Sequence, residues 1–144
     1  MKMKTSKEVL SSILKTTQMG QTGIRSVADY AVGTNLRREL QSQLKEYDAI
    51  ETEAHNIAKR KGWQVPELSK GVRVMSDMMS RTMLTVERQD SKIAAMMING
   101  NTRGMIKTIK NQHHSPNIDA SVRTLNQKLI DCETENIRQM QPYL

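Results

Sequence analysis

Apolar side chains recur three and four residues apart along most of this chain, and that spacing places them on one face of an α-helix. The pattern restarts four times. Its clearest members are Leu10, Leu14, Ile24, Ala28 and Ala31; Leu36, Leu40, Leu44, Tyr47 and Ala54; Ala94, Ile98 and Met105; and Val122, Leu125, Leu129, Cys132 and Met140. The sequence therefore predicts an all-α protein built on four long helices.

Start and stop signals set the limits of these helices. Thr5–Glu8 has the spacing of a capping box, in which each residue satisfies a backbone N–H of the other. Gly33 interrupts the pattern, and we expect Thr34 or Asn35 to cap the second helix. A basic turn followed by Gly62 is typical of a helix end. The sequence predicts helices at about 6–31, 35–61, 67–86, 91–113 and 118–141.

The lengths of the links predict how the helices are arranged. The first and second long helices are joined by a short link, as are the third and fourth, so each pair is expected to be antiparallel. The segment 67–86 forms a long crossover between the pairs. Two hairpins joined by one crossover is the ferritin-like arrangement of a four-helix bundle. We expect residues 1–144 to form a single domain, since this length suits one core.

The net charge of +7 is spread over both halves of the chain and forms no basic tail. Arg103, Lys107 and Lys110 share one face of the third long helix, which is either solvated or a contact for an anionic partner. The chain has no helix-turn-helix, zinc-finger or aromatic base-stacking signature, so we do not expect nucleic acid as the main partner.

The single cysteine excludes an intrachain disulfide and suits a reducing compartment. No segment approaches the roughly 18 apolar residues that a membrane span requires, and the first residues lack the apolar stretch of a signal peptide. We therefore expect a cytoplasmic protein without a membrane span.

Each long helix carries polar residues inside or beside its apolar face. They are Gln21, Glu51, Asn101 and Asn136, with Glu133 at the edge of the face that holds Asn136. A polar group inside a core costs free energy unless it is hydrogen-bonded. These residues are therefore expected to meet in one buried polar layer.

The positions of these residues resemble the di-metal ligands of the ferritin-like superfamily. Such a site uses one Glu from each of two helices and Glu-x-x-His from each of the other two. Gln21 and Asn101 stand where the single Glu residues would be. Glu51 is followed three residues later by Ala54, and Glu133 by Asn136, where His would be. The resemblance therefore implies a ferritin-like fold with a degenerate di-iron site, because most of the ligands are replaced.

The wider pattern is similar to a group of uncharacterised bacterial ferritin-like domains. The shared features are Gly20–Gly23 in the first helix, a Met-rich and aliphatic crossover at 74–84, and Gly100–Asn101 in the third long helix. Spore coat proteins with a similar bundle are a second, looser resemblance. The uncharacterised bacterial group has no assigned activity that could be transferred to this chain.

Other residues that could carry chemistry have simpler explanations. His113 and His114 lie at a predicted helix end, where a cationic His favours the helix dipole. Cys132 lies on an apolar face, where a thiol is usually inert. We expect no catalytic residue, cofactor or metal. If a metal binds, its ligands would come from Glu51, His55 and Glu133.

The crossover carries more large apolar residues than one flank of a bundle covers. Its methionines, Met75, Met78, Met79 and Met83, either pack on the core or bind a protein partner, and we expect self-association as a homodimer.

Three functional interpretations follow. The first is a non-catalytic ferritin-like structural or interaction protein. The second is a metal-binding or oxidative protein with a reduced ligand set. The third is a basic nucleic-acid-associated or spore-coat-like bundle protein.

Overall fold

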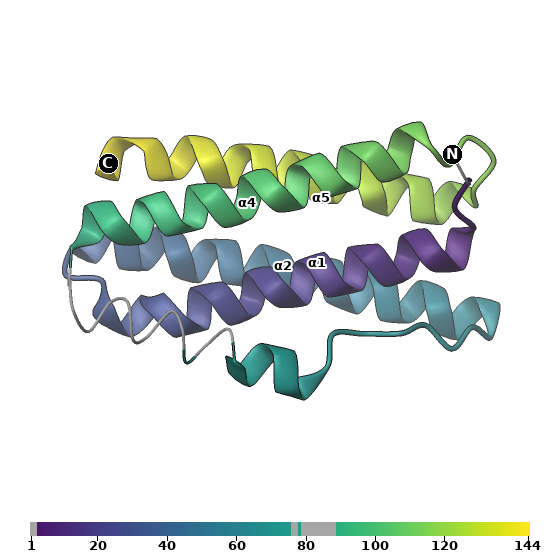
Figure 1. The fold of residues 1–144 in the computed structure, drawn as a ribbon, viewed down its shortest axis with the longest axis horizontal. Coiled ribbons are helices and arrows are strands. Elements are labelled where there is room, and N and C mark those ends of the chain that lie inside the picture. Colours follow the sequence, from purple (N-terminus) through teal and green to yellow (C-terminus); the bar gives the residue numbers. More distant parts are fainter. Residues whose placement is uncertain (1–2, 76–77, 79–88) are drawn as a thin grey trace.

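A computed structural model describes residues 3–75, 78 and 89–144 of the chain (Figure 1). The long helices are α1 (Ser6–Val27), α2 (Thr34–Lys61), α4 (Asp90–His113) and α5 (Ala120–Met140). A short helix, α3, is helical at residues 70–75 and at Met78. One turn of 3₁₀ helix follows α1 and another follows α5, at Ala28–Tyr30 and Gln141–Tyr143.

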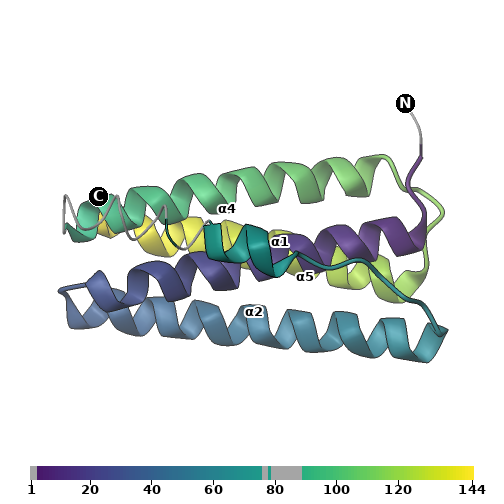
Figure 2. The same ribbon diagram turned by 60° about the horizontal axis from the view of Figure 1, so that its bottom comes forward.

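The long helices form two antiparallel hairpins, α1 with α2 and α4 with α5, as Figures 1 and 2 show. α1 also packs on α4, and α2 on α5. After α2 the chain runs back along the outside of the bundle, first extended over residues 63–69 and then as α3. The prediction of an all-α bundle of two hairpins with a helical crossover is confirmed.

Several of the predicted helix signals are present. Thr5 and Glu8 form both hydrogen bonds of the capping box. Gly62 ends α2 with a left-handed backbone, φ 67°, which a residue with a Cβ rarely adopts.

The predicted cap of the second helix is wrong. Gly33 is the N-cap of α2 and makes no side-chain capping bond, and Thr34 is the first helical residue. The Asp90 carboxylate, at the start of α4, instead accepts hydrogen bonds from the N–H groups of Val32 and Gly33, each at 2.8 Å. A carboxylate from another helix therefore satisfies the two N–H groups that immediately precede α2.

The crossover helix also differs from its predicted range of 67–86. Residues 67–69 belong to the extended connection, and the helix begins at residue 70. Glu67 and Leu68 are held by side-chain and backbone bonds to α1 and α2, which keeps this stretch out of a helix. The rest of the predicted range, with Met79 and Met83, lies outside the described residues.

The core is aliphatic, as a chain without Phe requires. The largest fully buried side chains come from all four long helices: Leu10, Ile13, Leu14, Ile24, Leu36, Leu40, Ile57, Ile93, Leu125, Leu129 and Met140. Burial of each such side chain contributes roughly 1.5–3 kcal/mol. Among the helices that the structure describes, none is long and apolar enough to cross a membrane.

Candidate functional site

The predicted polar residues lie in the bundle as two hydrogen-bonded groups. The first joins α1 to α2. The Gln21 amide donates hydrogen bonds to Glu51 Oε1 at 3.1 Å and to Asp48 Oδ1 at 2.9 Å. Gln21 is buried, whereas Glu51 is partly exposed. This group therefore lies at the edge of the bundle.

Gln18 extends the first group to the connection after α2. Its amide nitrogen donates to Glu51 Oε2 at 3.0 Å and to Glu67 Oε1 at 2.6 Å, and its carbonyl accepts the Leu68 N–H at 2.9 Å. His55 Nε2 lies 2.7 Å from Glu67 Oε1. The hydrogen bond from His55 is the main reason why the pKa of Glu67 is below its usual value. The buried Gln18 amide thus holds the carboxylates of Glu51 and Glu67 together, and the His55 imidazole lies beside them.

The second group joins α2, α4 and α5 inside the core. Tyr47 donates its hydroxyl to Asn101 Oδ1 at 2.7 Å, and Asn136 Nδ2 donates to the same oxygen at 3.2 Å. Asn101 donates in turn to the Met97 carbonyl at 2.7 Å. Burial raises the pKa of Tyr47 well above its usual value, so its hydroxyl remains a donor. These bonds link α2, α4 and α5, while Asn136 Oδ1 has no hydrogen-bond partner among the described residues.

Glu133 lies one turn before Asn136 and is 1% exposed. Within residues 3–75, 78 and 89–144, its Oε1 has no hydrogen-bond partner. Desolvation raises the pKa of its carboxyl group to about 8. Gly104 of α4 makes room for this side chain, because a Cβ there would lie 2.2 Å from Glu133 Oε2. The structure therefore buries a carboxyl group whose Oε1 is not satisfied by any described protein atom.

A pocket of about 550 Å³ opens between α1 and α4 and reaches Glu133, Tyr47 and Asn101. Its walls contain four glycines and several large apolar residues, and its rim is basic. The lining residues include Gly20, Gly23, Gly100 and Gly104; Met19, Leu68, Met96 and Met97; and Lys15, Arg103 and Lys107. Arg103 and Lys107 belong to the predicted anionic-partner face, whereas Lys110 is exposed and outside the pocket lining.

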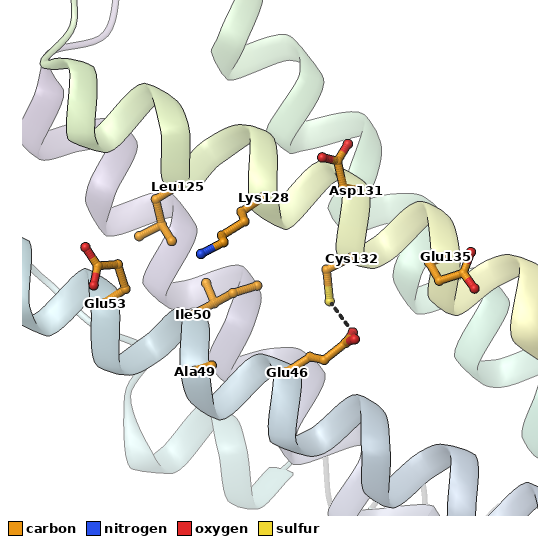
Figure 3. A pocket seen from close by; sticks show the side chains of 9 residues that line it. All are labelled: Glu46, Ala49, Ile50, Glu53, Leu125, Lys128, Asp131, Cys132 and Glu135. Carbon is orange, nitrogen blue, oxygen red and sulfur yellow. Dashed lines mark hydrogen bonds between the residues drawn. The ribbon is translucent and has the colours of Figure 1, made fainter.

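A second pocket, of about 350 Å³, lies between α2 and α5 (Figure 3). Cys132 of α5 points toward Glu46 of α2, and its thiol donates a weak hydrogen bond to the Glu46 carboxylate at 3.5 Å. Burial, followed by the charge of Glu46, raises the pKa of Cys132 to about 12. The thiolate is therefore almost absent at neutral pH, and Cys132 is a poor nucleophile.

The structure groups the predicted metal ligands differently from the sequence. Glu51, His55 and Glu67 offer ligand atoms that all lie within 4.8 Å of one another. Glu133 does not belong to this cluster and lies with the second polar group. His113 is exposed and His114 half-buried at the end of α4.

Three contributors were missed from the sequence. Gln18 lies three residues before Gln21, so a second amide on the same helix face was a usable signal. Tyr47 was assigned to the apolar pattern, although a buried phenol needs a hydrogen-bond partner. Glu67 lies in a connection without periodicity, and no local signal places it beside His55.

Comparison of the chain with models of known protein families, with curated proteins and with solved structures finds no match.

Proposed function

We propose that this protein is a non-catalytic ferritin-like bundle that acts as a structural or interaction protein. The two-hairpin topology supports the ferritin-like assignment. The central polar residues support the non-catalytic part, because two of the ligand positions hold neutral amides, Gln21 and Asn136, which hydrogen-bond Glu51 and Asn101. Neutral amides are poor ligands for hard metal ions and supply no charge to balance two of them.

The observation that carries an interaction function is the exposed apolar surface of α3. Its large apolar side chains are Val72, Val74, Met75 and Met78, which are 45%, 59%, 67% and 63% exposed. Apolar side chains gathered in this way usually mark an interface. A second copy of the chain is the partner we propose, since a two-fold pair buries the same surface on both copies.

Sedimentation of purified protein tests this self-association. We expect a dimer at micromolar concentration and a monomer for the Val72→Ser/Met75→Ser variant, because the two residues lie one turn apart on α3. Val32→Ser is the matched control, since Val32 is equally apolar and 76% exposed but lies in the turn before α2. A monomeric wild-type protein at high micromolar concentration, or an unchanged dimer in the double variant, would contradict the proposal.

A second candidate function is binding of one divalent cation, Zn²⁺ or Mn²⁺, by Glu51, His55 and Glu67. The closeness of their ligand atoms favours it. Zn²⁺ binds imidazole nitrogen and carboxylate oxygen at about 2.0–2.2 Å, so small side-chain movements would bring all three onto one ion. The ion would fasten the connection after α2 to the bundle. The competing interpretation is a direct contact between His55 and Glu67 alone, whose Nε2 and Oε1 atoms lie 2.7 Å apart.

Calorimetric titration with Zn²⁺ distinguishes the cation site from this direct contact. A cation site predicts about one ion per chain and affinity at least about tenfold weaker in His55→Ala, because a direct ligand is lost. His113→Ala, which changes an exposed imidazole at the end of α4, should bind as the wild type does. No binding, or equal affinity in His55→Ala, would leave only the direct contact.

A further inference from the structure

The pocket between α1 and α4 is not used by the proposed function. Space remains between these two packed helices because residues without side chains line it: Gly20 and Gly23 on α1, and Gly100 and Gly104 on α4. A Cβ at Gly23 or Gly100 would meet nothing within 4 Å, so this space is open. A volume of about 550 Å³ accommodates a small organic molecule.

The inner end of the pocket carries a carboxyl group without a full set of partners. Glu133 lines the pocket, is 1% exposed, and leaves Oε1 unpaired within the part of the chain that the structure describes. A buried acceptor without a donor destabilises the folded protein, because its hydrogen bonds to water have been lost and not replaced. An N–H donor entering the pocket would remove that destabilisation.

The outer rim of the pocket has the opposite charge. Lys15, Arg103 and Lys107 line it, and none of them forms an ion pair with a described residue. Desolvation, and then repulsion from Lys4 and Lys15, lowers the pKa of Lys107. An acidic group at the rim would relieve this repulsion.

Between the two ends the walls are largely apolar. Met19, Leu68, Met96 and Met97 line the pocket. Methionine side chains adapt to ligands of different shape. The pocket therefore suits a molecule with an aliphatic middle and two ends of opposite charge.

We propose that this pocket binds a straight-chain ω-amino carboxylate, whose ammonium group donates to Glu133 and whose carboxylate lies among Lys15, Arg103 and Lys107. Binding releases one proton from Glu133. The ligand enters as an ammonium ion, the Glu133 carboxyl group gives its proton to the solvent, and an ion pair forms. Each end of the ligand meets a group that lacks a partner of opposite charge in the described structure.

Calorimetric titration with straight-chain ω-amino carboxylates, from γ-aminobutyrate to aminooctanoate, tests the proposal. At least one of them should bind about tenfold or more tightly than both the matched carboxylate without an amine and the matched amine without a carboxylate. Titrations at neutral pH in buffers of different ionisation enthalpy should also show proton release. If none of the series binds, the proposal is wrong.

Two variants locate the ligand. Glu133→Gln keeps the shape of the side chain and removes its charge, so the amino carboxylate should bind no better than the matched carboxylate, without proton release. Gly100→Leu should abolish binding by filling the pocket at a position that is open in the structure. Lys110→Gln, which changes a cation outside the pocket lining, is the control and should bind as the wild type does. Unchanged affinity in Glu133→Gln or Gly100→Leu would overturn the proposal.

Discussion

At about pH 9 the Glu133→Gln variant is expected to be more stable than the wild-type protein by on the order of 4 kcal/mol, and near pH 4 the two should be about equally stable. The carboxyl group has a pKa of about 8 in the folded protein and a usual value of 4.5. Burial without a charged partner causes this difference, because it disfavours the ionised form. Glutamine has nearly the same shape and cannot ionise.

The sign of the pH dependence follows from proton binding. Below pH 4.5 both the folded and the unfolded chain keep the proton, and Glu133 causes no ionisation penalty. Between 4.5 and about 8 the unfolded chain loses the proton while the folded chain retains it, so the free energy of unfolding falls as pH rises. Above about 8 the folded carboxyl group is ionised too, and the penalty is complete.

Other groups near Glu133 do not produce this difference. Tyr47 on α2 and Cys132 on α5 titrate well above this window, and Lys15, Arg103 and Lys107 of the pocket rim are present in both proteins. Urea unfolding at several pH values measures the effect. Glu53→Gln, which removes one carboxylate of a surface ion pair with Arg60, should change stability by less than about 1 kcal/mol throughout. The same stability difference at every pH would mean that folding does not shift the Glu133 pKa.

The Gly104→Ala and Gly20→Ala variants should each lose roughly 1–3 kcal/mol of stability, or more, whereas alanine at two neighbouring glycines should increase it. A Cβ at residue 104 would lie 2.2 Å from Glu133 Oε2, and one at residue 20 would lie 2.6 Å from the Tyr47 ring. The Tyr47 ring is held by its hydrogen bond to Asn101. At residue 104 the whole Glu133 carboxyl group would have to shift, because its Cδ also lies only 2.9 Å from the added Cβ.

Gly23 and Gly100 provide the matched controls, because each lies on the same helix as one of the crowded glycines. A Cβ at either position meets nothing within 4 Å. Gly23→Ala and Gly100→Ala should therefore increase stability by roughly 0.5–1 kcal/mol each, since alanine is the better helix former. Urea unfolding of the four variants gives the comparison. If Gly20→Ala changed stability as much as Gly23→Ala, and Gly104→Ala as much as Gly100→Ala, the close contacts at residues 20 and 104 would be absent.

Short-range information in the sequence accounts for much of the fold. The capping box at Thr5–Glu8 and the stop at Gly62 depend on residues a few positions apart, and the apolar periodicity depends on neighbouring turns of one helix. Link lengths then restrict the four helices to two hairpins. Polar residues within the apolar faces also identified Gln21, Asn101, Glu133 and Asn136 as groups that would need special surroundings.

The sequence by itself thus determined the helices, their pairing and most of the polar positions, because these depend on local periodicity and on link length. Only the tertiary structure decided which side chains meet. Asp90 bonds the Gly33 N–H just before α2, Glu67 rather than Glu133 lies beside His55, and Tyr47 bonds Asn101. Such pairs join residues far apart in the chain, and they depend on how each helix is rotated and shifted along its axis. Packing of all four long helices around one core sets the rotation and the axial position of each helix, and no short segment of the sequence encodes them.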